Sequence, residues 1–290
     1  FSMIKKRENE LNTQSVLSMK GSGYYSQKTA GAKDAIDSIQ EMVNVSVSDL
    51  PKTQFLRFAD YGSADGGTSQ EFWFRFIKKI RENGDNRPIE ILYTDLASND
   101  FTTLFKTMQG LGEKRDFAYQ KLFGNVFVHG CGTGFHQQLL SKETLSMGFS
   151  ATAMHYVSEK PCHITKHVHM VGANPQERKE FEDQAAKDWE AILLARAKEL
   201  SVGGRFFCMN FGIDEQGRYL GNTGGHSMFD KFNEHWLSHF KEGLITEEEY
   251  ISATFAQHYR TVEEFCYPFK NKESAVSKAG LRLLSCKTKL

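Results

Sequence analysis

Apolar residues recur along the chain in two patterns, one typical of strands and one typical of helices. Short apolar runs predict strands at residues 53–59, 89–93, 125–129, 145–152, 205–211 and 281–284. Apolar positions at helical spacing predict helices at residues 30–48, 69–80, 101–108, 175–200, 228–240 and 246–253. Strands that alternate with helices favour an α/β fold with a mostly parallel central sheet flanked by helices.

Local residues mark two of the predicted helix ends. Thr68 and Ser69 are expected to cap the helix that follows them, because hydroxyl side chains accept hydrogen bonds from its free N–H groups. Gly203 and Gly204 follow the longest predicted helix and are expected to stop it.

The segment from Phe58 to Gly67 carries the most specific chemistry. An apolar strand leads into Asp60, and Gly62 and Gly66 follow with the spacing Gly-x-x-x-Gly. Nucleotide cofactors bind at such loops, where a strand ends and a helix begins. A dinucleotide site would need Gly-x-Gly-x-x-Gly instead. The spacing therefore favours S-adenosylmethionine over NAD, with Asp60 inside the loop and facing the cofactor amine.

Two further loops agree with this interpretation. Asp95 closes the second predicted strand, where an acid in a doubly wound sheet accepts hydrogen bonds from both ribose hydroxyls. Its alternative role is to cap a helix beginning at Leu96. Gly132 to Phe135 follow the third strand, and Phe135 would lie against the adenine or else pack as a core aromatic.

Composition and overall charge argue against some kinds of partner, although a local basic patch stays open. The 290 residues include 36 basic and 36 acidic ones, so no positive excess indicates nucleic acid or an anionic membrane. No apolar stretch reaches the ~18 residues of a membrane span. Five cysteines without a Cys-x-x-Cys pair favour free thiols in a reducing, cytoplasmic location. Met3 is expected to be the native start, and no signal peptide follows it.

Two histidine groups have spacings that can suit a metal. They are His163, His167 and His169 in one segment, and His235 and His239 in another. The first segment is expected to be loop and strand, and neither group contains the glutamate of a His-Glu-x-x-His site. We therefore expect no metal.

Several blocks of the chain, in the right order, resemble the SABATH group of S-adenosylmethionine-dependent methyltransferases, the salicylate, benzoate and caffeine type. The most specific is Tyr93 to Phe101, which is similar to the family's Asn-Asp-Leu-x-x-Asn-Asp-Phe stretch. The other blocks are Met19 to Tyr25, Phe58 to Gly66, Ser150 to Pro161, Glu199 to Arg205 and Glu242 to Ile245. The resemblance covers roughly residues 15–290.

This resemblance implies a Rossmann-like class I methyltransferase. It implies one domain over residues 1–290, with an α-helical cap over the substrate pocket formed by segments of roughly 155–175 and 215–270. It also suggests a homodimer. The chain ends about one helical segment and one strand pair earlier than typical members do.

The resemblance also assigns binding residues by position. It implies that S-adenosylmethionine is surrounded by Tyr25, Thr29, Asp60, Gly62, Ser63, Thr68, Asp95, Leu96, Gly134, Phe135, Ser150 and Ala151. It implies that the methyl acceptor lies among Lys20, Ala32, His155, Tyr156 and Phe229. Ala32 stands where many members have a glutamine that holds the substrate carboxylate, and Tyr156 stands where they have a tryptophan. Ser63 and Thr68 also replace family residues, but the cofactor site keeps its character.

The implied activity is O-methylation of a small carboxylic acid, with a methyl ester and S-adenosylhomocysteine as products. A carboxylate is ionised near neutral pH, so His155 and Tyr156 are expected to position it without a catalytic base. The removal of water from the acceptor is the other expected contribution of the pocket. His155 could instead be a base for a phenol or amine, or a merely packed residue. N-methylation of a small heterocycle and non-catalytic cofactor binding are therefore the alternatives.

Overall fold

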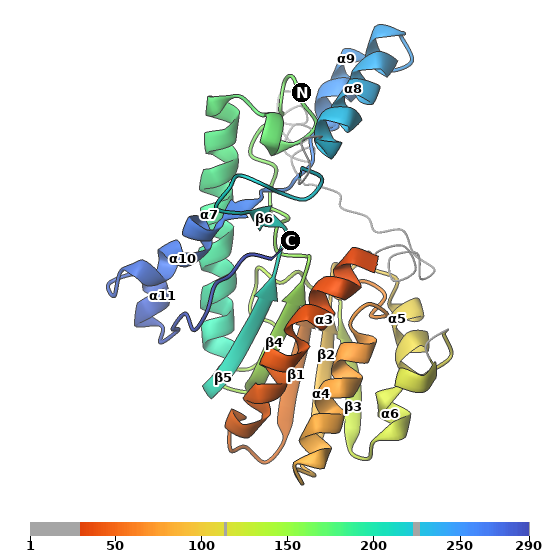
Figure 1. Ribbon diagram of the computed structural model, residues 1–290, viewed down its shortest axis with the longest axis vertical. Coiled ribbons are helices and arrows are strands. Elements are labelled where there is room, and N and C mark those ends of the chain that lie inside the picture. The colour runs from red at the N-terminus through yellow and green to blue at the C-terminus, as the bar shows by residue number, and fades with distance from the viewer. Residues whose placement is uncertain (1–29, 113–114, 223–226, 290) are drawn as a thin grey trace, which may run out of the picture. The chain divides into compact units, whose positions relative to one another are not determined.

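The structure, a computed structural model, describes residues 30–112, 115–222 and 227–289 (Figure 1). The chain forms two compact units, which we describe separately. Among the described residues, the sheet unit contains those of 30–154 and 194–210. The helical unit contains those of 155–193 and 211–289. The predicted cap segments, 155–175 and 215–270, fall in the helical unit, and their action as a cap stays a prediction.

The sheet unit is built on five parallel strands in the order β3-β2-β1-β4-β5. Their bounds are β1 Leu56–Tyr61, β2 Ile89–Thr94, β3 Val126–Cys131, β4 Leu145–Ala151 and β5 Leu200–Met209. Strands β2 and β3 lie on one side of β1, and strands β4 and β5 lie on its other side. The order therefore reverses beside β1, and ligands of open α/β sheets bind at the carboxyl ends of strands at such a point.

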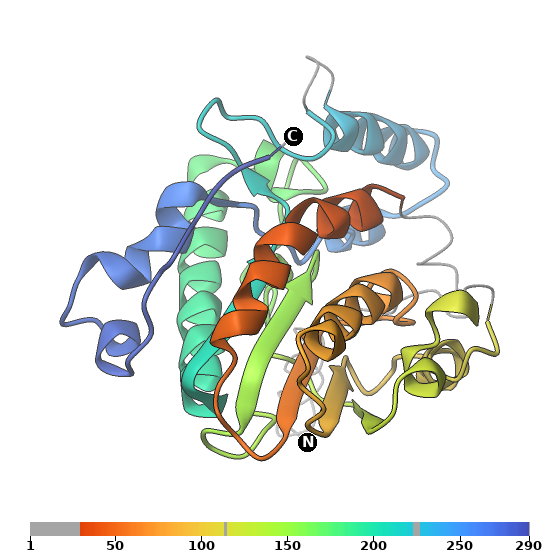
Figure 2. The same cartoon turned by 60° about the horizontal axis from the view of Figure 1, so that its bottom comes forward.

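Four α-helices lie wholly within the described part of the sheet unit. They are α3 Ala30–Val45, α4 Gln70–Glu82, α5 Phe101–Met108 and α6 Tyr119–Leu122. Two 3-10 turns, Ser46–Asp49 and Arg115–Phe117, complete the connections. Figure 2 shows α3 and α4, in red-orange and orange, over the same face of the sheet. This arrangement leaves the carboxyl ends of β1 and β2 next to the start of α4.

The core of the sheet unit is aromatic, because α4 turns large side chains toward β1 and β4. The apolar residues of α4 that are buried are Phe72, Trp73, Phe76, Ile77 and Ile80. Phe72 stacks on Phe149 of β4 with ring centroids 4.3 Å apart, and Trp73 stacks on Phe58 of β1 at 5.7 Å. Such aromatic pairs stabilise a core by more than the burial of their apolar area alone would. They also fix the start of α4 relative to the end of β1.

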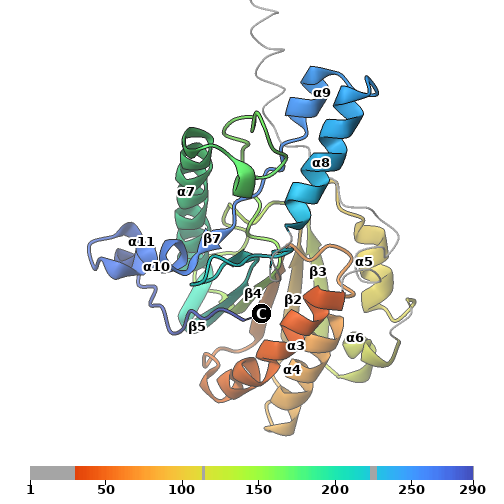
Figure 3. The same ribbon diagram turned by 45° about the horizontal axis from the view of Figure 1, so that its top comes forward.

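The helical unit has its own apolar core. Its elements are the 3-10 turn Met170–Gly172, α7 Pro175–Glu199, β6 Gly212–Ile213, α8 Met228–Lys241, α9 Glu247–Ser252, β7 Arg260–Thr261, α10 Val262–Lys270 and α11 Ala275–Lys278. The last residues of α7 belong to the sheet unit. The buried residues that form this core are Val157, Ile164, Met170, Phe181, Ala185, Phe229, Ala256 and Tyr259. Within this unit α8 and α9 lie side by side (Figure 3). No helix in the described ranges is long and apolar enough to cross a membrane.

The prediction that Gly203 and Gly204 stop the longest helix is wrong. Helix α7 ends at Glu199, β5 begins at Leu200, and both glycines lie inside the strand. The register between β4 and β5 shifts between Leu145 and Met147, so extra residues of β5 bulge there. Gly203 has a φ of +83°, and a Cβ on Gly204 would lie 2.9 Å from the Leu145 carbonyl oxygen. The glycines therefore permit a bulge.

A second correction concerns the C-terminal segment. The predicted strand at residues 281–284 is absent, and residues 279–289 have no regular secondary structure. Leu283 and Leu284 are 42% and 77% exposed, so their apolar pattern is not buried by a sheet. The pattern also failed to predict β6, β7 and α10. Strands of two residues, such as β6 and β7, are too short to show a period.

The aromatic core leads to a stability prediction. Phe58→Ala should lower the free energy of unfolding by about 3–5 kcal/mol, because Phe58 is fully buried between Trp73 and Phe76. Phe127→Ala is the matched control, because Phe127 is on β3 and 49% exposed, and it should cost less than about 1 kcal/mol. Urea denaturation followed by circular dichroism measures both. Equal losses would contradict the described core.

Candidate functional site

Backbone hydrogen bonds join the loops that follow β1 and β2. The N–H groups of Gly62 and Ser63 both donate to the carbonyl oxygen of Thr94, at 2.9 and 3.1 Å. The Ala64 N–H donates to Oδ2 of Asp95 at 2.7 Å. The glycine loop and the end of β2 are therefore held together, mostly by main-chain groups.

The loop after β3 lies against the same two loops. A Cβ built on Gly62 would lie 3.6 Å from Cε1 of Phe135, and one built on Gly134 would lie 3.6 Å from Cδ2 of Leu96. The Phe135 ring thus faces the glycine loop, and Gly134 faces the residue after Asp95. The structure brings together the three loops that the sequence singles out.

Gly62 and Gly66 are required by the shape of the first loop. Their φ angles are +77° and +70°, in the region that favours glycine. A Cβ on Gly62 would also lie only 2.3 Å from Cβ of Ala153. The Gly-x-x-x-Gly spacing therefore records two positive-φ positions and a close approach to the segment after β4.

Asp60 lies inside strand β1 and not in the loop, which corrects the sequence-based placement. Its Oδ2 accepts hydrogen bonds from Ser69 Oγ at 2.6 Å and from Trp73 Nε1 at 2.9 Å. No described residue donates to Oδ1. Ser69 is the N-cap residue of α4, but its hydroxyl donates to Asp60 and makes no cap hydrogen bond. The Thr68 hydroxyl makes none either, so the capping prediction is wrong for both residues.

The carboxyl group of Asp60 is harder to ionise than an ordinary aspartate. Burial raises its pKa to about 6, and the negative charge of Asp95 adds to this rise. The hydrogen bonds from Ser69 and Trp73 stabilise the carboxylate and oppose the rise. A cation beside Oδ1 would favour the ionised form.

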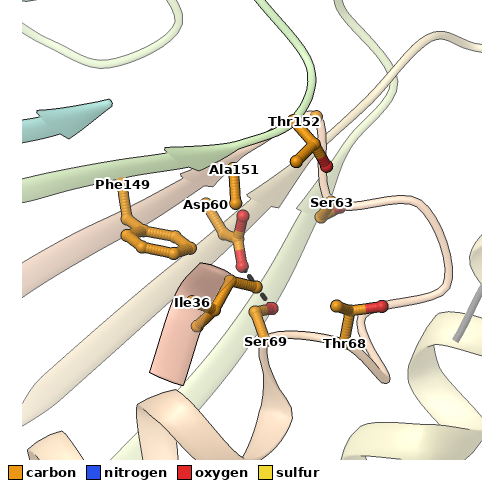
Figure 4. A pocket seen from close by; sticks show the side chains of 9 residues that line it. Ile36, Asp60, Ser63, Thr68, Ser69, Phe149, Ala151 and Thr152 are labelled. Carbon is orange, nitrogen blue, oxygen red and sulfur yellow. Dashed lines mark hydrogen bonds between the residues drawn. The ribbon is translucent and has the colours of Figure 1, made fainter. Parts of the chain in front are cut away.

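A small cavity lies next to this carboxyl group, at the carboxyl ends of β1 and β4. Its volume is about 20 Å³, close to the room that one water molecule needs. The lining residues are Ile36, Asp60, Gly62, Ser63, Thr68, Ser69, Phe149, Ala151 and Thr152. Figure 4 shows one oxygen of Asp60 bonded to Ser69 and the other directed toward Ala151. The hydroxyl of Thr68 is buried, and no described residue bonds to it. The cavity therefore offers a negative charge and a hydroxyl to a group of the size of an ammonium.

Asp95 stands directly after β2, as predicted, and organises two loops. Its Oδ1 accepts from the Leu96 N–H and its Oδ2 from the Ala64 N–H, both at 2.7 Å. Burial raises the pKa of Asp95, and these two N–H groups oppose that rise. The following helix, α5, is capped by Asp100, whose side chain accepts from the Thr103 N–H. The alternative that Asp95 caps the next helix is therefore excluded.

Not every predicted cofactor residue lines the cavity. Ser150 is buried in β4, and its hydroxyl donates to the Tyr61 carbonyl oxygen at 2.8 Å. Its neighbour Ala151 does line the cavity. Lys20, Tyr25 and Thr29 lie outside the described residues.

The predicted acceptor residues belong to different units. Ala32 is buried in α3 of the sheet unit, whereas His155, Tyr156 and Phe229 belong to the helical unit. His155 is buried, and its ring lies 4.6 Å from Tyr156 and 5.8 Å from Tyr259. His155 and Tyr156 thus belong to one aromatic cluster. Of the other residues of this cluster, the sequence analysis named only Phe229.

The aromatic cluster contains residues that the sequence analysis missed. Gln257 pairs with Tyr156 through a β-bridge and a side-chain hydrogen bond. His169 stacks on Phe229, with ring centroids 3.8 Å apart. Burial lowers the pKa of His169 to about 3, so this ring is neutral at physiological pH. In the sequence, the aromatic residues Phe255 and Tyr259 on either side of Gln257 are the signal for this part of the cluster.

The histidine-rich segment is held by ordinary contacts. His167 bonds through Nε2 to Asp230 at 3.0 Å and through Nδ1 to the backbone of His169. Within the described residues, no three side chains of the metal-binding types are grouped so that they could hold an ion.

The family of S-adenosylmethionine-dependent carboxyl methyltransferases matches residues 13–274 of the chain. Gibberellic acid methyltransferase 1 of Arabidopsis thaliana is 24% identical over 89% of this chain and 74% of that protein. Loganic acid O-methyltransferase of Catharanthus roseus is 23% identical over 83% and 67%. Methyltransferase FUS9 of Gibberella moniliformis is 28% identical over 64% and 49%. The chain thus spans about half the length of several relatives and up to three quarters of others.

A solved structure supports the same relationship at the level of the fold. Loganic acid methyltransferase with S-adenosylhomocysteine superposes with a TM-score of 0.71 at 19% identity, covering 86% of this chain and 73% of that one. The predicted fold, an α/β methyltransferase with a mostly parallel sheet, is confirmed. The predicted cofactor is confirmed for the family. With residues 13–274 matched, the chain belongs to the S-adenosylmethionine-dependent carboxyl methyltransferase family.

Proposed function

We propose that this protein is an O-methyltransferase that converts a small carboxylic acid to its methyl ester, with S-adenosylhomocysteine as the second product. The observation that carries the proposal is the buried carboxyl group of Asp60, with one oxygen left for a ligand at the cavity. The cavity lies beside the end of β1, where nucleotide cofactors bind in folds of this kind. S-adenosylmethionine carries an ammonium that suits this oxygen, and it supplies an electrophilic methyl group.

The three loops can share the parts of this cofactor. Asp60, Ser63 and Thr68 would hold the amino-acid part, with Gly62 allowing close approach and Ala151 forming the wall near the methyl group. A carboxylate can accept about four hydrogen bonds. Asp95 accepts two from backbone N–H groups, which leaves room for both ribose hydroxyls.

The adenine side of this placement uses Leu96, Gly134 and Phe135. Leu96 is 40% exposed, so its side chain is available to cover an aromatic ring. Phe135 is half-buried and presents one ring edge to Gly62. Tyr25 and Thr29 are proposed for the cofactor, and Lys20 for the acceptor, on the family resemblance alone. Ser150 would support the site indirectly, because its hydroxyl donates to the Tyr61 carbonyl oxygen and does not line the cavity.

Methyl transfer to a carboxylate requires orientation and the exclusion of water more than proton transfer. The acceptor is ionised near neutral pH, so no general base is needed. We propose that His155, Tyr156 and Phe229 bind it, together with Gln257 beside Tyr156. Burial raises the pKa of Tyr156, so its hydroxyl stays protonated and can donate a hydrogen bond to an oxygen.

N-methylation of a heterocycle is the second candidate. Ala32 is buried and has no amide to hold a carboxylate, and His155 could accept a proton from an N–H acceptor. Paraxanthine methyltransferase 2 of Arabidopsis thaliana is 26% identical over 65% of this chain and 57% of that protein. Cytoplasmic location, a homodimer and the absence of a nucleic-acid partner remain predictions.

A panel assay tests the proposed reaction. The protein is incubated with labelled S-adenosylmethionine and with separate carboxylic acids, phenols and N–H heterocycles. We expect label in a base-labile methyl ester of at least one acid. Label only in heterocycles would support the second candidate instead. S-adenosylhomocysteine binding without any turnover would leave a non-catalytic cofactor-binding protein.

Asp95→Ala should weaken the binding of S-adenosylhomocysteine by at least about tenfold, since it removes two proposed ribose bonds and the anchor of Ala64. Isothermal titration calorimetry measures the dissociation constant. Glu90→Ala is the control, because Glu90 is also on β2 and pairs with Arg57. Unchanged binding in Asp95→Ala would refute the placement of the ribose.

Cofactor binding should also depend on pH through Asp60. Its pKa of about 6 leaves only about a tenth of the carboxyl groups ionised at pH 5 and most of them ionised at pH 7. The cofactor ammonium stays charged over this range and needs the ionised form. The affinity for S-adenosylhomocysteine should therefore rise about tenfold from pH 5 to pH 7, with proton release on binding near pH 6.

The matched variant for this pH dependence is Asp60→Asn. It keeps the shape of the side chain and loses the titrating group, so its affinity should be low and nearly constant from pH 5 to pH 7. Burial also raises the pKa of Asp95, so the contribution of Asp60 is the difference between the profiles of the unaltered protein and the variant. A flat profile in the unaltered protein would contradict the pairing of Asp60 with the ammonium.

A further inference from the structure

A buried ion pair stands at the junction of α7 and β5. The side chains of Arg196 and Glu199 are both fully buried, and Arg196 Nε lies 2.7 Å from Glu199 Oε2. A second bond joins Arg196 Nη2 to Glu199 Oε1 at 2.9 Å. Taking two charges out of water is costly, so such a pair is weak evidence for a stabilising role. Its remaining bonds indicate another role.

All of those remaining bonds lead to one segment or to β1. Arg196 donates to the carbonyl oxygens of Phe135 and Gln137, each at 2.8 Å. Glu199 accepts from the N–H groups of Leu139 and Leu140. Residues 135–140 have no helix or strand. The fork of an arginine and the two oxygens of a carboxylate thus hold this segment from one side.

Tyr61 ties the pair to the first loop of the cofactor site. Its hydroxyl donates to Glu199 Oε2 at 2.6 Å, and the Arg196 guanidinium lies 4.1 Å from the centre of its ring. Tyr61 is the last residue of β1, directly before Gly62. The end of β1 and the segment after β3 therefore share one buried network.

Helix stability does not explain the position of Glu199. It is the last residue of α7, where the partial negative charge of the helix end disfavours a carboxylate. Arg196, the Tyr61 hydroxyl and the N–H groups of Leu139 and Leu140 compensate that charge. The local cost is offset by bonds that order a loop outside the helix.

We propose that Arg196 and Glu199 are positioning residues for the cofactor, which hold Phe135 in the place that receives the adenine. The proposal rests on the proposed function, since that assigns Phe135 to the adenine. Both side chains are fully buried, so the pair would act through this segment and not by contact with a ligand. It orders residues 135–140 before binding, so that the conformational entropy of this segment is not lost when the ligand arrives.

Arg196→Lys tests this role. Lysine keeps a positive charge beside Glu199 but cannot bridge the carbonyl oxygens of Phe135 and Gln137. We expect the dissociation constants of S-adenosylhomocysteine and of adenosine to rise about tenfold each. With an acceptor from the panel, KM for S-adenosylmethionine should rise similarly while kcat at saturation stays the same. A purely structural role would instead lower the melting temperature and leave these constants unchanged, which would overturn the proposal.

Arg81→Lys is the matched control. Arg81 also holds loops through carbonyl oxygens, those of Asp85, Arg87 and Gly124. These residues precede β2 and β3, so they lie at the opposite edge of the parallel sheet. The Arg81→Lys variant should bind S-adenosylhomocysteine and adenosine with the same dissociation constants as the unaltered protein. An equal loss in both variants would show a general effect on folding and would overturn the proposal.

Tyr61→Phe is a milder second variant, which decides the matter if Arg196→Lys does not fold. It removes the hydroxyl that donates to Glu199 and should weaken adenosine binding about two- to threefold. Unchanged adenosine binding in this variant would overturn the proposal.

Measurements on the unaltered protein separate this inference from the proposed function. Binding of S-adenosylhomocysteine without ester formation would reject the reaction but leave the positioning role in place. The absence of any binding would reject both.

Discussion

The carboxyl group of Asp60 is the point on which the geometry of the sheet unit depends. One of its oxygens accepts from the hydroxyl that starts α4 and from the indole one turn later. A strand and the helix that follows it are thereby joined by a buried acid, beneath the loop that connects them. Burial of that acid is unfavourable unless it is bonded. The fold supplies bonds for one oxygen and leaves the other to a ligand, so the same group serves the structure and the binding site.

The features that the sequence predicts well are local or follow from topology. Alternation of strands and helices predicts the parallel sheet, and the ends of neighbouring strands must then meet, which brings Asp95 and Phe135 close to Gly62. Glycine spacing predicts the loop because positive φ angles at Gly62 and Gly66 leave little other choice of residue. The placement of Asp60 inside the strand cannot be read from the sequence, because an apolar run does not show at which residue strand pairing stops.

Other features depend on partners far along the chain and leave no periodic trace. The glycines of β5 resemble a helix stop, and only the shifted pairing with β4 identifies a bulge. The aromatic cluster gathers His155, Phe229 and Tyr259 from separate segments. The network of Arg196 is similar, because its partners at Tyr61 and Phe135 are distant in sequence. A resemblance to a family can indicate such positions, but periodicity cannot.

The way in which the glycine loop is fastened has a consequence for protein engineering. The carbonyl oxygen of Thr94 receives the N–H groups of both Gly62 and Ser63, so main-chain atoms determine the course of the loop there. The side chain at position 63 borders the cavity but contributes only a long contact, at 3.3 Å, to that fastening. Position 63 is therefore a place where side-chain size and polarity can be varied to reshape the cavity while the path of the loop is kept.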